Sequence, residues 1–147
     1  MGYRSEVVLV VGREVMPQFM ATMCSSQQAR AMCFDEAERV PTAEMPELER
    51  WVLHRIHEMD ALVRQTTDDF EFHTQWTALH NFCAVELSAL YFDIRKDALY
   101  CDASDSLRRR AARTVLDALF SHLTAWLAPI LCFTAEEAWL SRRGEGD

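Results

Sequence analysis

The stretch MPELERWVLHRIHEMDALVRQ, residues 45–65, indicates most directly which fold the chain adopts. Its apolar residues recur at spacings of three and four, as they do along one face of an α-helix. These residues are Leu48, Trp51, Val52, Ile56, Met59, Leu62 and Val63. Pro46 suits the first position of the helix, because its missing N–H has no partner there. The opposite face is predicted to be polar and to carry Glu49, Arg50, Glu58 and Arg64.

Three more helices are predicted after this stretch. The second covers residues 72–97, and its apolar face is formed by Phe72, Trp76, Leu79, Cys83, Leu87, Leu90, Tyr91 and Ile94. The third begins near Ser106 and should be kinked or stopped by Pro129, which has no N–H to donate. Its apolar face is formed by Leu107, Ala111, Val115, Leu116, Leu119, Leu123 and Leu127. Residues 134–137, TAEE, resemble a capping box that opens a short fourth helix through Trp139.

These patterns predict an all-α fold, an antiparallel helix bundle with short connections and an irregular N-terminal segment. The only strand-like run is VVLVV, residues 7–11, in the least regular part of the chain. We expect residues 1–33 to form a divergent segment that is compatible with a weak helix. Residues 34–140 are expected to form the helical domain, and residues 141–147 a flexible tail.

The composition limits what the chain can bind. Its 147 residues carry a net charge of −8, which argues against general nucleic-acid binding because that affinity depends on neutralising phosphates. Between residues 13 and 143 there is no glycine, and therefore no glycine-rich loop to hold a nucleotide phosphate. The apolar run at residues 7–11 is too short to span a bilayer. We expect a cytoplasmic protein that does not enter a membrane.

No pattern of catalytic or metal-binding residues stands out. The five cysteines contain no CxxC pair, and we expect reduced, mostly buried thiols. His54 and His57, like His80 and Cys83, are three residues apart, but neither pair completes the four ligands of a zinc site. The acidic cluster DDFE, residues 68–71, is expected to be a capping and dipole feature of the helix ends rather than a pair of carboxylates for acid–base chemistry. We therefore predict no catalytic residue, no metal site and no cofactor.

The basic side chains indicate more about the function than the cysteine, histidine and acidic residues do. Four of them lie within two turns at the start of the third helix, namely Arg108, Arg109, Arg110 and Arg113. Cations at a helix N-terminus are unfavourable for the helix dipole, so stability alone does not explain them. Asp102 and Asp105 are expected to compensate in part. Two interpretations stay open at this point: a solvated basic face paired with acids, or a patch that contacts phosphates.

Two stretches resemble a known family. They are LHNFCAVELSALYFDIRKDALYCD, residues 79–102, and RRRAARTVLDALFSHLTAWLAPILCFTAEEAW, residues 108–139. Both are similar to the helical anticodon-binding domain of bacterial isoleucyl-tRNA synthetases, which are class I aminoacyl-tRNA synthetases. The likeness covers residues 34–139 in collinear order.

The resemblance implies a module that binds the stem and anticodon arm of its tRNA. Arg95 and Lys96 then become candidates for RNA or interdomain contact, and Asp93 and Asp97 for orienting them. The family's HIGH-type and KMSKS-type motifs are missing from the sequence, whose only lysine is Lys96. We therefore do not expect the chain to activate isoleucine by itself.

Two functions follow as expectations. The first is a tRNA-binding module for an isoleucine-type tRNA, which contacts phosphates through Arg95, Lys96, Arg108, Arg109, Arg110 and Arg113. The alternative is a synthetase-derived helix bundle that no longer binds tRNA and acts as a dimer or protein-interaction module. A second copy of the chain and the catalytic body of a synthetase are the further partners that we consider.

Overall fold

The structure is a computed structural model that describes residues 39–143. The expectations for residues 1–33, including the strand-like run, and for residues 144–147 lie outside this range. The chain divides into two compact units, one formed by residues 36–122 and the other by residues 1–35 and 123–147. Each unit is therefore described by itself.

The first helix of the larger unit matches the opening stretch. After a short 3₁₀ turn, η3 (Thr42–Glu44), helix α4 covers Glu47–Asp68 and is preceded by Pro46. Four predicted core residues are buried, namely Val52, Ile56, Met59 and Val63. Glu49 is also buried, although the sequence placed it on the polar face. The amphipathic pattern therefore located the helix correctly but assigned one charged residue to the wrong side.

The second predicted helix is one continuous helical segment with an unexpected middle. It consists of α5 (Phe72–Asn81), a π-helical stretch η4 (Phe82–Phe92) and α6 (Asp93–Cys101). The residues at both junctions keep right-handed helical dihedral angles, so the segment does not break. It ends four residues later than the sequence predicted.

The π-helical stretch changes which side chains face the core. Leu79, Leu87 and Tyr91 are buried as predicted, but Phe72, Trp76, Leu90 and Ile94 are exposed, which is a correction. In a π-helix the backbone bonds join residues five apart, so the buried position advances from Phe82 to Leu87. The predicted apolar face therefore contains the core residues Leu79, Leu87 and Tyr91 but misses Phe82, whereas Phe72 and Trp76 are exposed although they lie before the π-helical stretch.

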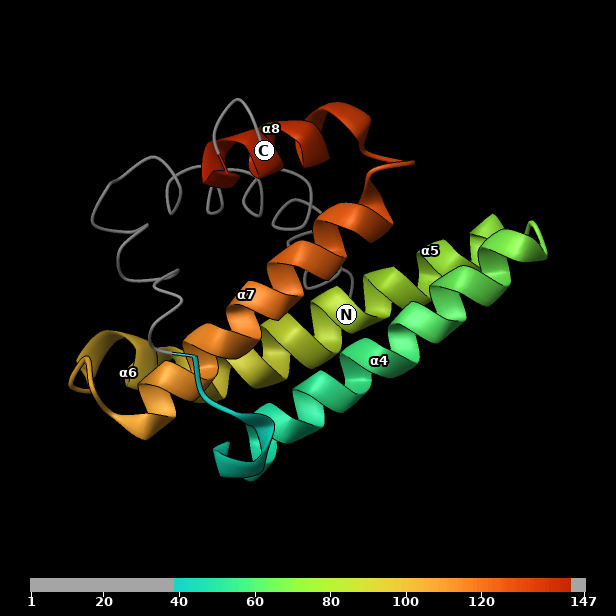
Figure 1. The fold of residues 1–147 in the computed structure, drawn as a ribbon. Coiled ribbons are helices and arrows are strands. Elements are labelled where there is room, and N and C mark those ends of the chain that lie inside the picture. The colour runs from blue at the N-terminus through green and yellow to red at the C-terminus, as the bar shows by residue number, and fades with distance from the viewer. Residues whose placement is uncertain (1–38, 144–147) are drawn as a thin grey trace, which may run out of the picture. The chain divides into compact units, whose positions relative to one another are not determined.

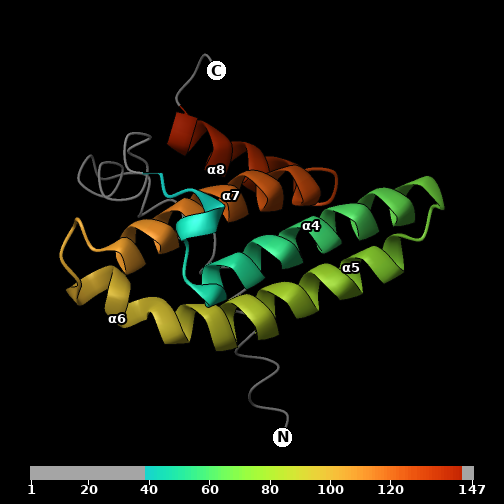
Figure 2. The same ribbon diagram turned by 60° about the horizontal axis from the view of Figure 1, so that its bottom comes forward.

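Helix α4 and the segment α5–η4–α6 form an antiparallel hairpin (Figures 1 and 2). Two ion pairs cross it: Arg55 Nε lies 2.7 Å from Glu86 Oε2, and Arg95 Nε lies 2.5 Å from Glu49 Oε1. The first pair joins the middles of the helices, and the second joins the start of α4 to α6. The hairpin therefore has two distinct ends, the α4–α5 turn and the α6–α7 connection.

The α4–α5 turn contains a strained residue. The N–H of Glu71 donates to Thr66 O at 2.8 Å and that of Phe70 to Thr67 O at 3.2 Å, which is a Schellman motif. The motif places its pivot residue in the left-handed region, where glycine is preferred. Here Phe70 occupies that position with φ of 58°. An exposed aromatic residue therefore sits where the backbone favours glycine.

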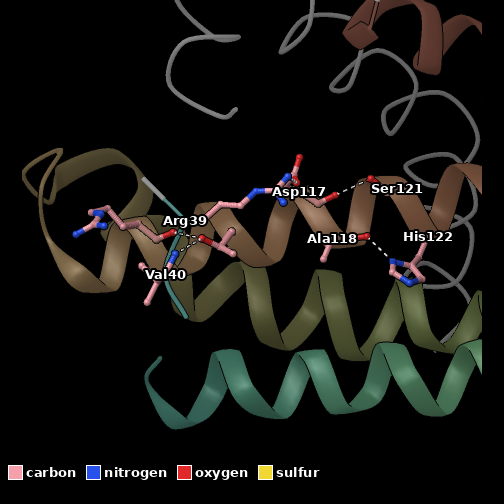
Figure 3. Close-up of polar contacts among 8 residues, drawn as sticks. Arg39, Val40, Asp117, Ala118, Ser121 and His122 are labelled. Atoms are coloured by element: carbon pink, nitrogen blue, oxygen red, sulfur yellow. Dashed lines mark hydrogen bonds and ion pairs between the residues drawn. The ribbon is translucent and has the colours of Figure 1, made fainter. Parts of the chain in front are cut away.

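Helix α7 (Leu107–Leu127) returns along the hairpin, and its residues up to 122 belong to the larger unit. Ala111, Val115 and Leu119 are buried as predicted, whereas Leu107 is exposed. Residues 39–40 lie against this helix (Figure 3): Val40 N–H donates to Thr114 Oγ1 at 3.2 Å, and Arg39 pairs with Asp117 at 2.8 Å. The larger unit is thus formed by three helical elements, which are α4, the segment α5–η4–α6 and the first part of α7.

Residues 123–143 contain the end of α7 and helix α8 (Cys132–Arg143). Pro129 lies in the turn between them, as the sequence predicted. Helix α8 begins two residues before Thr134, so Thr134 lies inside the helix and the predicted capping box is wrong. The N–H of Ala135 instead donates to Leu131 O at 2.9 Å, which starts the helix earlier.

The predicted all-α bundle is confirmed. No residue between 39 and 143 lies in a β-strand. Within the described range no helix is long and apolar enough to cross a membrane. The same residues contain no group of three or more His, Cys, Asp or Glu side chains that could hold a metal ion.

Candidate nucleic-acid interface

The connection between α6 and α7 is organised by Asp102, whose backbone turns extended as α6 ends. Its carboxylate accepts two hydrogen bonds from Arg108, Nε at 2.9 Å and Nη2 at 2.8 Å, and a third from the Ser106 hydroxyl at 3.2 Å. Its backbone carbonyl accepts from Arg109 Nη1 at 2.6 Å. The Arg108 guanidinium holds the pKa of the Asp102 carboxyl below its usual range. The acid thus orients two cations at the start of α7.

These contacts leave donors on both arginines. A guanidinium has five N–H donors, and Asp102 occupies two of those on Arg108. Nη1 of Arg108 makes no hydrogen bond to any residue between 39 and 143, and the side chain is 54% exposed. Nε and Nη2 of Arg109 likewise have no partner within the described residues. Both guanidinium groups can therefore donate to an additional anion while Asp102 holds them.

Lys96 lies on the exposed side of α6, one turn before the connection. Its ammonium donates to Asp93 Oδ1 at 2.8 Å, and this hydrogen bond raises the pKa of Lys96. The predicted role of Asp93 in orienting Lys96 agrees with this contact. Because an ammonium has three donors, two stay available to a ligand.

Arg95 has a different environment from its neighbour. Its side chain is only 12% exposed, and Nε and Nη2 donate to Glu49 at 2.5 and 2.9 Å. Glu49 is 0% exposed, so the pair is held inside the hairpin. The hydrogen bond to Glu49 raises the pKa of Arg95. The expectation that Asp93 and Asp97 orient Arg95 is wrong, because Glu49 does so from α4.

Tyr91 completes this buried group. Its ring is fully buried and its hydroxyl lies 3.5 Å from Glu49 Oε1. Burial, and then the nearby Glu49 carboxylate, raise the pKa of Tyr91. Glu49 therefore has two partners from the opposite helix, and its charge is matched by Arg95. The sequence contained a signal for this: Glu49 precedes the buried Val52 by one turn.

Arg110 and Arg113 are not among the arginines that Asp102 holds. Successive residues in a helix point in directions about 100° apart, so Arg110 points away from Arg108, whereas Arg113 lies one turn after Arg109 on the same face. By spacing, Arg110 lies one turn before Thr114, and Arg113 one turn before Asp117. Thr114 and Asp117 are the residues that contact residues 39–40 (Figure 3). Both arginines are half-buried.

The structure therefore brings together only part of the predicted set. Arg108 and Arg109 contact Asp102, and Lys96 lies one turn before the connection on α6. All three keep unused donors, and we call these three cations the basic corner. Residues 93–113 as a whole hold six basic and four acidic side chains, an excess of two positive charges. The local charge is thus opposite in sign to the net charge of −8.

The α4–α5 turn at the other end of the hairpin is acidic. Asp68 is the last residue of α4, Asp69 follows it, and Glu71 precedes α5 without a side-chain capping bond. The capping role predicted for this cluster is therefore wrong for Glu71. The exposed Phe70 and Phe72 lie among these acids with their rings edge to face, 6.2 Å between centroids.

The thiols also differ from the prediction of mostly buried cysteines. Cys83 in η4 is half-buried, and burial raises its pKa to about 11. Cys101 at the end of α6 and Cys132 at the start of α8 are exposed. Cys24 and Cys33 lie outside the described residues.

Comparison with known proteins agrees with this geometry. Residues 49–146 match the family model described as the anticodon-binding domain of tRNA ligase. Similar proteins include isoleucine–tRNA ligases from Ruegeria pomeroyi, 61% identical over 115 residues, and Gluconobacter oxydans, 53% identical over 114 residues. The aligned parts cover 77% and 78% of this chain. The chain spans only 12% of the length of each of these two relatives.

Proposed function

This chain belongs to the anticodon-binding domain family of tRNA ligases, and we propose that it binds tRNA as the anticodon-arm module of an isoleucine–tRNA ligase-like protein. The observation that carries the proposal is the basic corner. Its three cations are fixed by Asp93 and Asp102, yet each keeps hydrogen-bond donors that no described residue uses. Such pre-oriented donors suit the phosphate oxygens of an RNA backbone.

The proposal assigns different roles to the six basic residues that were predicted to contact RNA. Lys96, Arg108 and Arg109 bind phosphates directly, whereas Arg95 holds α6 against α4 through Glu49. Arg110 and Arg113, which Asp102 does not hold, remain predicted contacts. Because three phosphate contacts release few counterions, log Kd is expected to rise with log salt with a slope of about 2.

Isoleucine tRNA is the proposed ligand because the similar proteins named above are isoleucine–tRNA ligases. The sequence printed here contains neither of the ATP-binding motifs of that family, so the proposal does not include amino-acid activation. It keeps the cytoplasmic location expected from the sequence.

The test is a fluorescence-anisotropy titration of labelled isoleucine tRNA at several salt concentrations, with an unrelated tRNA as competitor. We expect micromolar or tighter binding that favours the isoleucine tRNA, with log Kd rising linearly with log salt. No binding at low salt contradicts the proposal.

A second candidate function, a protein-interaction or dimer module, is favoured by one observation. Trp76, Leu90 and Ile94 are apolar and exposed along α5–η4–α6. Exposed apolar side chains in this number promote association. Sedimentation of the chain at rising concentration, with and without tRNA, separates the two functions, because only this candidate requires a mass above that of one chain without RNA.

A further inference from the structure

Tyr100 is an exposed aromatic side chain at the basic corner. It lies in the last turn of α6, and 74% of it is exposed. It has no hydrogen bond and no aromatic contact with any residue between 39 and 143. Tyr91, nine residues earlier on the same helical segment, is fully buried and bonded to Glu49. The two tyrosines therefore differ completely in what their rings contact.

Tyr100 lies between cations along the chain. Lys96 is four residues earlier on α6, which places both side chains on the same face one turn apart. Asp102, two residues later, holds Arg108 and Arg109. Hydrogen bonds to Asp93 and Asp102 raise the pKa of Lys96 and Arg108, respectively, and the charge of Asp97 adds to both shifts, so both cations lie within electrostatic range of Asp97 on α6.

This combination distinguishes Tyr100 from the other exposed aromatic residues of the described range, which are Phe70, Phe72, Trp76 and Phe133. None of those four has a lysine or arginine within one helical turn along the chain. Phe70 and Phe72 lie beside three carboxylates, which repel phosphate. Phe133 is followed one turn later by Glu136 and Glu137.

We propose that Tyr100 is the platform on which an unpaired base of the bound RNA stacks, while Lys96 and Arg108 hold the phosphates beside it. Single-stranded RNA is recognised by this pairing of an aromatic ring with adjacent cations. A protein partner would not need the cations, and a paired RNA helix would not offer a free base. The inference rests on the proposed function and names the part of the RNA that the corner contacts.

The test compares Tyr100→Ala, Tyr100→Phe and wild type in the anisotropy titration with isoleucine tRNA. Loss of a stacking ring is expected to weaken binding by about 5- to 150-fold. Tyr100→Phe keeps the ring and is expected to bind within about twofold of wild type, since the hydroxyl has no partner in the described residues. The salt slope should stay unchanged in both, because no charge is removed.

Two controls identify the cause. Phe70→Ala removes an exposed ring at the acidic turn and should not change affinity. A fully paired RNA duplex should bind wild type and Tyr100→Ala equally, because it has no free base. Helicity measured by circular dichroism checks that the variants fold.

The outcomes separate this inference from the proposed function. If wild type binds tRNA and Tyr100→Ala binds equally well, the stacking platform is refuted and the function stands. If wild type binds no tRNA, the stacking inference and the proposed function are both contradicted. If Tyr100→Phe is as weak as Tyr100→Ala, the hydroxyl rather than the ring acts, which also refutes stacking.

Discussion

The two ends of the α4–α5–η4–α6 hairpin differ in almost every respect except that each exposes an aromatic ring. At the α6–α7 connection, Asp102 holds two arginines, and their remaining donors bind no residue between 39 and 143. At the α4–α5 turn, the carboxylates of residues 68–71 surround Phe70, and no cation compensates them along the turn itself. The same hairpin (Figure 2) therefore presents a phosphate-attracting end and a phosphate-repelling end.

The difference shows that the net charge of the chain does not describe the local charge at either end of this hairpin. Its acidic residues are abundant, but Asp93 and Asp102 near the connection orient cations. The acidic residues at the turn form no ion pair with a basic residue in the described part of the chain. Coulomb interactions between exposed charges are screened beyond about 10 Å at ordinary salt. An RNA at the basic corner would therefore sense the local excess of cations more than the distant turn.

The largest expected effect comes from breaking the ion pair that supports the basic end. Arg95→Ala leaves Glu49 buried and without its cation, which should lower the free energy of unfolding by about 3–5 kcal/mol. Urea denaturation followed by circular dichroism measures this change. The double variant Glu49→Leu with Arg95→Met removes both charges and should recover most of the loss. A loss below about 1 kcal/mol for Arg95→Ala would show that the pair does not anchor α6.

An intermediate effect is expected when the cysteines are used as probes of RNA contact. Cys101 follows Tyr100 and is exposed, so bound tRNA should slow its alkylation several-fold. Cys132 is exposed but far along the chain from the corner, and its rate should not change. Cys83 should resist alkylation at pH 8 with or without RNA, because a thiol with a pKa of about 11 is almost entirely protonated there. Peptide mapping after brief treatment with iodoacetamide gives the three rates, and protection of Cys132 alone would place the RNA elsewhere.

The smallest expected effect concerns the acidic turn. Phe70→Gly removes the side chain that crowds a left-handed backbone position, and stability should rise by about 0.5–1 kcal/mol. The lost edge-to-face contact with Phe72 is exposed and offsets only part of this gain. Thermal unfolding measures the difference. A clear decrease in stability would show that the Phe70 ring contributes to the fold, which its exposure does not suggest.

The sequence predicted the helices well because their apolar periodicity is strong. The start of α4 after Pro46 and the end of α7 before Pro129 both follow from local chemistry. The core side of α5–η4–α6 was predicted only in part, since the π-helical stretch buries Phe82, which a constant period of 3.6 residues did not select. The early start of α8 likewise depends on a backbone bond from Ala135 to Leu131, not on a capping side chain.

The candidate site was predicted only in outline. The arginine-rich start of α7 was recognised, but periodicity does not tell which arginines stay available. Glu49 was assigned to solvent because a carboxylate is rarely buried without a partner, and its partner Arg95 lies 46 residues away. The sequence did not identify Tyr100 as a stacking residue, because the exposure of a ring at the end of α6 depends on the direction that α7 takes after the connection.

The most direct test of the central claim compares two arginines in matching surface pairs. Arg108 pairs with Asp102 at the basic corner, and Arg64, 76% exposed, pairs with Asp60 near the acidic turn at 2.7 Å. The salt dependence of isoleucine tRNA binding should be measured for Arg108→Gln and Arg64→Gln. We predict that Arg108→Gln weakens binding and reduces the slope of log affinity against log salt by about 0.7–1, one phosphate contact, whereas Arg64→Gln leaves both near wild type. Equal effects of the two substitutions, or none from Arg108→Gln, would contradict tRNA binding at the basic corner.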